Sequence, residues 1–288
     1  MRTEKEIYDL VLNFAFQDER IRIVTLEGSR TNVNIPKDNL QDITFFVIDM
    51  GEFLKSDDWL SVFGNRIMMQ KPEDMELFPP EEKGFSYIML FDDGVKIDLT
   101  LLPVSMLEEY LTRDKLVKIM LDKDNMIKTE IVPTDEDYYI KCPTERKFDD
   151  CCNEFWNVAT YVSKGLLRGE ILFAIDHMNE VLRHELLRMI SWYVGTEKGF
   201  NFSLGKNYKF LDKHISKELW DNLLNTYSMS SYEEMWKSFD LCLCLFKKIS
   251  KKVADSLGYN YPDYDENVTK YLETQKRISN KYLYGNRY

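Results

Sequence analysis

The sequence is short of histidine and cysteine, on which much enzyme chemistry depends. Three histidines occur among 288 residues, so a Ser-His-Asp triad or a histidine-rich zinc site is poorly supplied. The five cysteines are an odd number, and their spacing fits neither a zinc ribbon nor a disulfide framework. We therefore expect reduced, partly buried thiols. His177 and His184, seven residues apart, are interpreted as structural side chains rather than a metal pair.

Long apolar runs and a basic surface are also missing. No stretch of about 18 apolar residues appears, and the charged N-terminus, Met1 to Glu6, lacks the apolar core of a secretory signal. We therefore expect no membrane span and a cytoplasmic location. The net charge of −11 disfavours nucleic acid, whose phosphates require a basic surface. It suits a cationic small molecule, which an acidic cleft concentrates, although solubility alone would also explain the acidity.

Two kinds of periodicity divide the chain, which is 44% apolar and 14% aromatic, as is typical of a globular protein. In the first half we expect helices at 3–17 and 57–64 and strands at 21–27 and 43–48. We also expect a hairpin whose arms are 85–91 and 95–102, joined by an Asp-Gly turn. In the second half helical periodicity dominates, at 145–168, 170–194, 216–226, 231–257 and 266–282.

These patterns predict an α+β fold in two domains. Residues 1–140 are expected to form a mixed β-sheet flanked by helices, with 104–112 and 114–122 at least partly helical. Residues 141–288 are expected to form an all-helical domain.

Gly28-Ser29-Arg30 follows directly after the strand expected at 21–27. Glycine lets a backbone approach a phosphate closely, Ser29 can offer its hydroxyl and amide to a phosphate oxygen, and Arg30 can neutralise charge. The tripeptide alone is equally typical of a plain turn. Its interpretation as a nucleotide-binding segment, with Gly28, Ser29 and Arg30 as the contacts, therefore depends on what accompanies it.

Two acids accompany this turn. Asp42 lies at the start of the next expected strand, and Asp98 lies within the apolar strand 95–102. A carboxylate in such a strand is costly to bury unless it is paired or binds a cation. Transfer of a nucleotidyl group requires carboxylates that hold Mg²⁺ near the reacting phosphate. We predict that Asp42 and Asp98 lie side by side as catalytic metal ligands; a salt-bridged strand residue is the other interpretation of Asp98.

Seven motifs extend this evidence along residues 1–275: Gly28-Ser29-Arg30, Gln41-Asp42, Met68 to Met75, Lys96 to Leu101, Asp149 to Trp156, Glu170 to His177 and Gly205 to Phe210. Together they resemble the aminoglycoside 6-adenylyltransferases, the streptomycin adenylyltransferase family. The resemblance implies a polymerase-β-like nucleotidyltransferase domain followed by a helical domain. It also implies Mg²⁺, ATP as co-substrate and a cationic, streptomycin-like aminoglycoside as substrate, and hence antibiotic resistance.

The second strand departs from the family pattern. That pattern is Gln-Asp-Tyr-Asp-Ile-Thr-Phe-Phe, and acids at i and i+2 share one face of a strand and can reach one metal site. Here Gln41-Asp42 is followed directly by Ile43, so one acid is missing and Asp42 stands for either of the two. The position two residues before Asp42 is Leu40, which cannot bind a metal, and Asp38 in the preceding loop is the alternative donor.

The helical half supplies further candidates. Asp176 lies in an apolar stretch and is predicted to act as general base on the drug hydroxyl, with contact to a substrate amine as the alternative. Lys206, after Gly205, is predicted to meet the triphosphate, or else to be an exposed turn lysine. Three acids near the domain junction are candidate guanidinium ligands: Glu145, Asp149 and Asp150. Three tryptophans are expected to pack in the helical core: Trp156, Trp192 and Trp236.

The sequence thus predicts an adenylyltransferase that moves AMP from ATP to an aminoglycoside hydroxyl and releases pyrophosphate. We expect ATP and the drug as its partners, no nucleic acid and no membrane, and a monomer rather than a larger assembly. One alternative is a nucleotide- or drug-binding protein with impaired catalysis, because the pair of metal-binding acids is incomplete. Another is an adenylyltransferase that modifies a protein.

Overall fold

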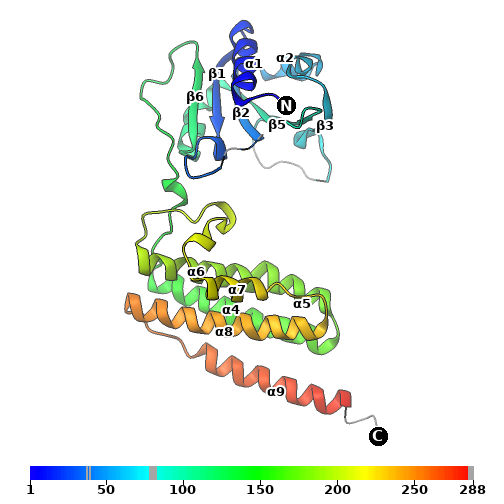
Figure 1. The fold of residues 1–288 in the computed structure, drawn as a ribbon, viewed down its shortest axis with the longest axis vertical. Coiled ribbons are helices and arrows are strands. Elements are labelled where there is room, and N and C mark those ends of the chain that lie inside the picture. Colours follow the sequence, from blue (N-terminus) through cyan, green and yellow to red (C-terminus); the bar gives the residue numbers. More distant parts are fainter. Residues whose placement is uncertain (37, 39, 78–82, 285–288) are drawn as a thin grey trace. The chain divides into compact units, whose positions relative to one another are not determined.

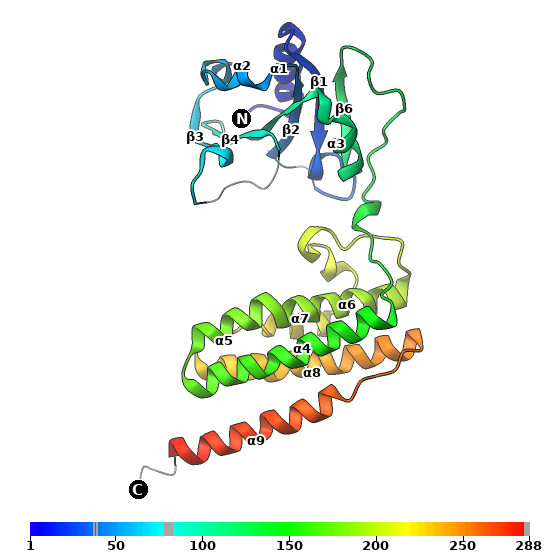
Figure 2. The ribbon, with the colours of Figure 1, turned by 180° about the vertical axis from the view of Figure 1, so that it is seen from behind.

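The computed structural model describes residues 1–36, 38, 40–77 and 83–284. The chain forms two compact units, Met1–Asp137 and Tyr138–Tyr288. The first unit contains a mixed β-sheet with flanking helices, and the second is helical, as Figures 1 and 2 show. The predicted α+β fold class is therefore confirmed. None of the helices in the described part of the chain is long and apolar enough to cross a membrane.

Unit 1 is built on a sheet in which the described residues form six strands in the order β3-β4-β5-β2-β1-β6. The strands are β1 (Ile21–Glu27), β2 (Leu40–Val47), β3 (Arg66–Gln70), β4 (Phe85–Phe91), β5 (Lys96–Pro103) and β6 (Val117–Asp122). The central strands β2 and β5 run parallel, and the other paired neighbours run antiparallel. A parallel central pair brings the starts of β2 and β5 to the same edge of the sheet.

Each strand alternates its side chains between two faces of this sheet. One face is dry: apolar residues of the central strands, such as Val24, Phe45 and Leu99, pack under α1 (Glu4–Gln17), α2 (Met50–Leu54) and the 3₁₀ segment Asp58–Phe63. The other face is apolar at one end only, where Ile23 and Phe46 pack against the short helix α3 (Leu107–Arg113). Next to this apolar end, the central strands β2 and β5 carry polar side chains on the second face, among them Thr44, Lys96 and Thr100.

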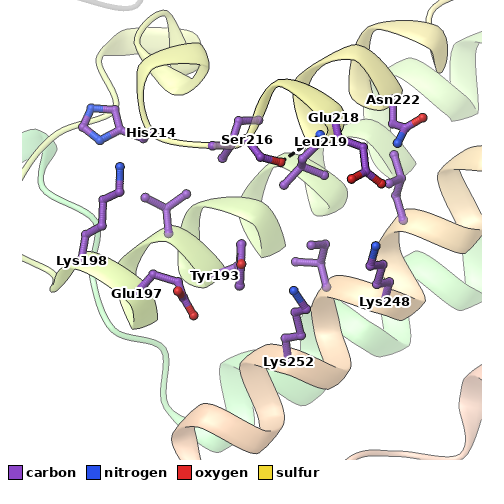
Figure 3. Close-up of a pocket in the computed structure, with 14 residues that line it drawn as sticks. Tyr193, Glu197, Lys198, His214, Ser216, Glu218, Leu219, Asn222, Lys248 and Lys252 are labelled. Carbon is purple, nitrogen blue, oxygen red and sulfur yellow. Dashed lines mark hydrogen bonds between the residues drawn. The ribbon is translucent and has the colours of Figure 1, made fainter.

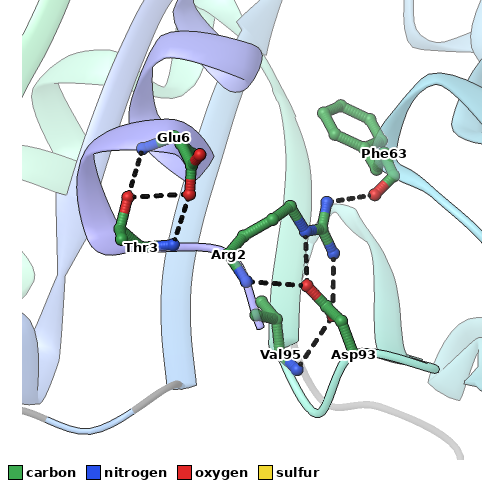
Figure 4. A network of polar contacts seen from close by, with 6 residues as sticks. All are labelled: Arg2, Thr3, Glu6, Phe63, Asp93 and Val95. Atoms are coloured by element: carbon green, nitrogen blue, oxygen red, sulfur yellow. Dashed lines mark hydrogen bonds and ion pairs between the residues drawn. The ribbon is translucent and has the colours of Figure 1, made fainter.

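The N-terminus is fastened to the sheet by a polar network, shown in Figure 4. Arg2 donates to both carboxylate oxygens of Asp93 in the β4–β5 turn, at 2.8 and 3.2 Å, and also to the carbonyl of Phe63. Thr3 and Glu6 form a capping box at the start of α1, which satisfies amide donors that the first helical turn leaves free. Helix α1 therefore begins at a fixed place over the dry face.

Three details of unit 1 differ from the sequence-based expectation. The segment expected as helix at 114–122 is largely the strand β6, which pairs with β1. The edge strand β3 had no counterpart in the expected elements. The short helix α2 was not expected, whereas the helix expected at 57–64 is present as the 3₁₀ helix Asp58–Phe63. Both strands lie at sheet edges, where a mostly half-exposed segment carries little of the strict alternation that identifies a strand.

Unit 2 is a set of helices around one apolar core: α4 (Glu145–Arg168), α5 (Ile171–His177), α6 (Arg183–Lys198), α7 (Lys217–Asn225), α8 (Tyr232–Leu257) and α9 (Tyr264–Tyr284). A π-helical turn, Met178–Leu182, joins α5 to α6. Trp156 and Trp192 belong to the buried core and Trp236 packs against it, which confirms the expectation for these side chains. Each of the five cysteines is a free thiol, and Cys151, Cys152 and Cys242 are buried.

Candidate functional site

Gly28-Ser29-Arg30 forms a 3₁₀ turn directly after β1. Gly28 has φ +61°, a conformation that costs a non-glycine residue about 1–2 kcal/mol. A Cβ atom on Gly28 would lie 3.1 Å from Oδ2 of Asp42. The glycine is therefore needed twice, once for the backbone turn and once because the carboxylate of Asp42 occupies the adjacent space.

Asp42 and Asp98 are direct partners in the register of the parallel strands β2 and β5. Register partners on neighbouring strands point to the same face, and the strands lie about 4.8 Å apart. This is the juxtaposition that the sequence led us to expect. Both side chains are partly buried, and both lie on the polar part of the second face. The structure thus brings Gly28, Asp42 and Asp98 together, while their roles as catalytic and metal-binding residues stay predictions.

Lys96 holds the carboxylate of Asp98. Its Nζ lies 2.5 Å from Oδ1 and 2.6 Å from Oδ2. Residues 96 and 98 project to the same face of β5, so the contact follows from the period of the strand. The salt-bridged interpretation of Asp98 therefore describes the structure as it stands, without a metal. A cation bound to Asp98 has to compete with this ammonium group.

Glu27 is a third carboxylate at this place, and the sequence analysis did not identify it. It ends β1, one residue beyond the register pair Leu26 and Ile43, which brings it alongside Asp42. The hydroxyl of Thr44 donates to its Oε1. Burial raises the pKa of Glu27, the hydrogen bonds from Thr44 and Tyr110 oppose that rise, and the charge of Asp42 adds to it. The sequence did contain one signal: Glu27 is two and four residues after Thr25 and Ile23 on the same strand, so the three side chains project from the same face of the sheet.

If Asp42 stands for the second acid of the family pattern, the place of the missing acid falls on Leu40, which pairs in register with Lys96 and is 47% exposed. The alternative donor, Asp38, accepts a hydrogen bond from the Leu40 amide at 2.9 Å, so its carboxylate caps the start of β2. Among the described residues no group of three or more His, Cys, Asp or Glu side chains has a geometry that holds a metal ion.

Two carboxylates nevertheless fit a magnesium ion that is shared with a substrate. Mg²⁺ prefers oxygen ligands and is commonly held by one or two protein carboxylates, with phosphate oxygens and water completing its coordination. Asp42 and Asp98 supply donors of this type from adjacent strands. Gly28 leaves the space beside Asp42 free of a side chain. The residues present therefore fit the ion, provided that the Lys96 ammonium group moves away from Asp98.

Arg30 is placed differently from the simple expectation of a free phosphate ligand. Its side chain is 2% exposed, its Nη2 lies 3.1 Å from the carboxylate of Glu4 in α1, and its Nη1 donates to the carbonyl of Asp38. The guanidinium thus ties α1 to the loop before β2. A phosphate contact from Arg30 requires that the pair with Glu4 opens, because the group is otherwise engaged within unit 1.

The candidates of unit 2 lie in separate places. Asp176 is exposed on α5, although it lies in an apolar stretch of the sequence. Lys206 is exposed in a 3₁₀ turn in which Asn207 and Tyr208 both have positive φ. Glu145 accepts hydrogen bonds from Asn260, and Asp150 pairs with Arg146; Asp149 is partly buried in the first half of α4. Each of these acids therefore either has a partner within unit 2 or is partly buried on its helix.

Comparisons with known proteins show the family to which the chain is similar. A family model described as streptomycin adenylyltransferase matches residues 1–275. An aminoglycoside 6-adenylyltransferase of Campylobacter jejuni is 62% identical over 279 residues, which cover 96% of this chain and 97% of the relative. Relatives with the same name from Bacillus subtilis and Staphylococcus aureus are 58% and 54% identical, with at least 94% of each chain covered. A crystal structure of an aminoglycoside 6-adenyltransferase from Bacillus subtilis is 52% identical over 96% of this chain and 99% of that chain, with a TM-score of 0.48.

Proposed function

Because the chain belongs to the streptomycin adenylyltransferase family, we propose that it transfers AMP from ATP to a hydroxyl group of a streptomycin-like aminoglycoside and releases pyrophosphate. The relatives that support this activity are similar along nearly their whole length. The proposal extends to magnesium as the required cation and to antibiotic resistance as the biological outcome. In this scheme unit 1 handles the nucleotide and unit 2 contributes to the drug site.

The observation that carries the proposal is the register of β2 and β5, which sets Asp42 beside Asp98 next to the Gly28 turn. These two carboxylates would hold Mg²⁺. When bound there, the ion would neutralise charge on the phosphates as the transfer proceeds. The backbone of Gly28 and the hydroxyl and amide of Ser29 would contact phosphate oxygens, because a turn without a Cβ lets the nucleotide approach closely.

The transfer itself is a substitution at the α-phosphorus. The drug oxygen forms a bond to that phosphorus, the bond from the phosphorus to the oxygen shared with the β-phosphate breaks, and pyrophosphate leaves with the electron pair. The hydroxyl proton passes to a base, for which Asp176 is our candidate, with contact to a drug amine as its other role. Asp176 is exposed on α5, and as a base it would have to lie within hydrogen-bond reach of the drug hydroxyl. Lys206 and Arg30 would bind the phosphates, the latter after leaving Glu4.

The test is a turnover assay with the purified full-length chain, ATP, MgCl₂ and streptomycin. We expect pyrophosphate release that depends on both drug and magnesium, and a drug product that has gained one AMP. Asp42→Asn and Asp98→Asn should each reduce the rate by at least about a hundredfold, since misplacing reacting groups by an ångström already costs roughly that much. Drug-independent release, or full activity of both variants, would refute the proposal.

Leu40 at the position of the missing acid supports a second candidate, a protein that binds nucleotide and drug but turns over poorly. The two candidates differ in one measurement. Binding of ATP and streptomycin with ordinary affinity, but without formation of adenylylated drug over many hours, would favour the binding protein. In that case Leu40→Asp, which restores an acid on the same face of β2 as Asp42, should raise the rate.

A further inference from the structure

Unit 2 contains a cavity of about 520 Å³ between the segment that precedes α4, the first half of α4, and α6. The lining includes the aromatic ring of Trp192 and equal numbers of acids and bases. The acids are Asp150, Glu154 and Glu185, and the bases are Lys141, Lys147 and Arg188. All of these residues belong to unit 2, so the cavity exists without any contribution from unit 1. Acids and bases balance in number, so the charges of the lining largely cancel.

Glu185 is the unusual member of this lining. It is only 8% exposed, although it carries a carboxylate. One oxygen, Oε1, lies 3.3 Å from Nη2 of Arg188, and the other, Oε2, is buried without a hydrogen-bond partner among the residues that the structure describes. Buried carboxylates are normally paired through both oxygens, because an unsatisfied buried acceptor is costly. The pairing of Glu185 is therefore half complete.

Arg188 cannot readily complete it from its own place on the helix. The two residues are three positions apart on α6, and the Arg188 side chain is 52% exposed while that of Glu185 is 11% exposed. The guanidinium thus reaches the carboxylate from the solvent side through one long contact. A guanidinium that enters from the cavity can instead lie parallel to the carboxylate and donate to both oxygens, which is the stronger geometry.

The surroundings suit a flat cation. Trp192 lies seven positions after Glu185, on the same face of α6, and an indole ring stabilises a guanidinium stacked on it. Asp150 and Glu154, one helical turn apart on α4, add carboxylates on the opposite wall.

A second cavity of unit 2 is lined by more lysines than acids. It measures about 260 Å³ and lies between α6, α7 and α8, and Figure 3 shows Lys198, Lys248 and Lys252 around it. Glu197 and Glu218 are its acids. Its surplus of ammonium groups repels a polycation. The two cavities therefore supply a test site and a control site in the same unit.

We propose that Glu185 is the anchor of a guanidinium subsite in unit 2, which receives a guanidinium group of the drug when Arg188 swings aside. The choice of drug rests on the proposed function, since streptomycin carries guanidinium groups whereas many aminoglycosides carry only ammonium groups. Glu185 then accepts hydrogen bonds on both oxygens, and Trp192 stacks on the flat face of the guanidinium group. Before the drug binds, Arg188 neutralises the charge of Glu185.

The experiment is calorimetric titration of streptomycin into the full-length protein without nucleotide. We expect Glu185→Gln, which keeps the shape but removes the charge, to weaken binding at least about tenfold. Glu185→Asp, which keeps the charge, should recover part of the loss. Arg188→Met should strengthen binding several-fold, because the internal competitor is gone. Glu218→Gln, in the lysine-rich cavity, is the matched control and should bind as the unchanged protein does.

Kanamycin, which has ammonium but no guanidinium groups, separates the subsite from general charge attraction. We expect its affinity to be similar in the unchanged protein and in Glu185→Gln. Equal streptomycin affinity of Glu185→Gln and the unchanged protein, or weaker binding by Arg188→Met, would overturn the subsite and leave the proposed function standing. Failure of the unchanged protein to bind or modify streptomycin would overturn both. Should Glu185→Gln fail to fold, Arg188→Met and Glu185→Asp still decide.

Discussion

Replacing Gly28 by alanine perturbs the candidate site by a single methyl group. The residue has φ +61°, and the new Cβ would lie 3.1 Å from Oδ2 of Asp42. That separation is tighter than an ordinary contact between carbon and oxygen, so the carboxylate has to yield by a few tenths of an ångström. The substitution therefore acts on the backbone and on the predicted metal ligand at once, and these two effects can be separated.

The magnitudes follow from the geometry. A left-handed backbone conformation costs alanine about 1–2 kcal/mol relative to glycine, which corresponds to a lowering of the melting temperature by roughly 2–8 °C for a domain of this size. Displacement by an ångström in an active site can cost about a hundredfold in rate. A shift of a few tenths of an ångström in Asp42 should then lower kcat by about three- to tenfold.

Gly258 provides the matched control. It ends α8 with φ +70°, and a Cβ on it would meet nothing within 4 Å. Gly258→Ala should therefore lose similar stability and keep full activity. The assay is streptomycin-dependent pyrophosphate release at saturating ATP, together with calorimetric melting of both variants. If Gly28→Ala and Gly258→Ala show the same kcat, Asp42 does not act beside Gly28, and our account of the site is wrong.

Three further outcomes follow from the structure. Lys96→Met should raise Mn²⁺ affinity about threefold or more in an equilibrium titration, because the ammonium group that competes for Asp98 is removed; weaker binding would contradict this. Glu27→Gln should raise the melting temperature at neutral pH, because burial raises the pKa of Glu27 and an amide avoids the buried charge. The same variant should bind Mn²⁺ more weakly; an unchanged Mn²⁺ affinity would show that Glu27 does not contribute to the metal site. Asp93→Asn should destabilise the protein by about 1 kcal/mol at pH 7. Arg2 holds the pKa of Asp93 well below its usual range. The stabilisation is therefore present above an unfolded-state pKa of about 4 and declines as the pH falls towards the folded-state value. If the difference in melting temperature between the unchanged protein and Asp93→Asn did not narrow at pH 3, the assignment would be contradicted.

Much of the fold was predictable because its central elements carry strong patterns. The alternation in β4 and β5 and the Asp-Gly turn between them identified the hairpin, and the long apolar stripe of α4 identified that helix to its ends. The edge strands β3 and β6 were not found, since most of their side chains are only partly buried and the alternation that marks a strand is weak there. Edge strands become strands because a neighbour offers free backbone groups, which the local sequence does not reveal.

The site was predictable only in part, for a similar reason. The juxtaposition of Asp42 and Asp98 follows from two acids at the starts of adjacent strands, and the structure has it. Glu27 was missed because its proximity to Asp42 depends on the antiparallel register of β1 and β2. Arg30 was predicted to contact phosphate, and its ion pair with Glu4 was not foreseen because it depends on how α1 packs beside the turn after β1. Contacts across elements of this kind are properties of the tertiary fold.

The central claim is that Asp42 and Asp98 hold one divalent cation. Mn²⁺ titration followed by electron paramagnetic resonance, in the presence of a non-hydrolysable ATP analogue, tests it on the full-length protein, on Asp42→Asn, on Asp98→Asn and on the double variant. If both carboxylates serve the same ion, each single substitution weakens binding at least about tenfold and the second adds much less than the first. Two independent, fully additive losses, or Mn²⁺ binding by the double variant as tight as that of the unchanged protein, would contradict the account.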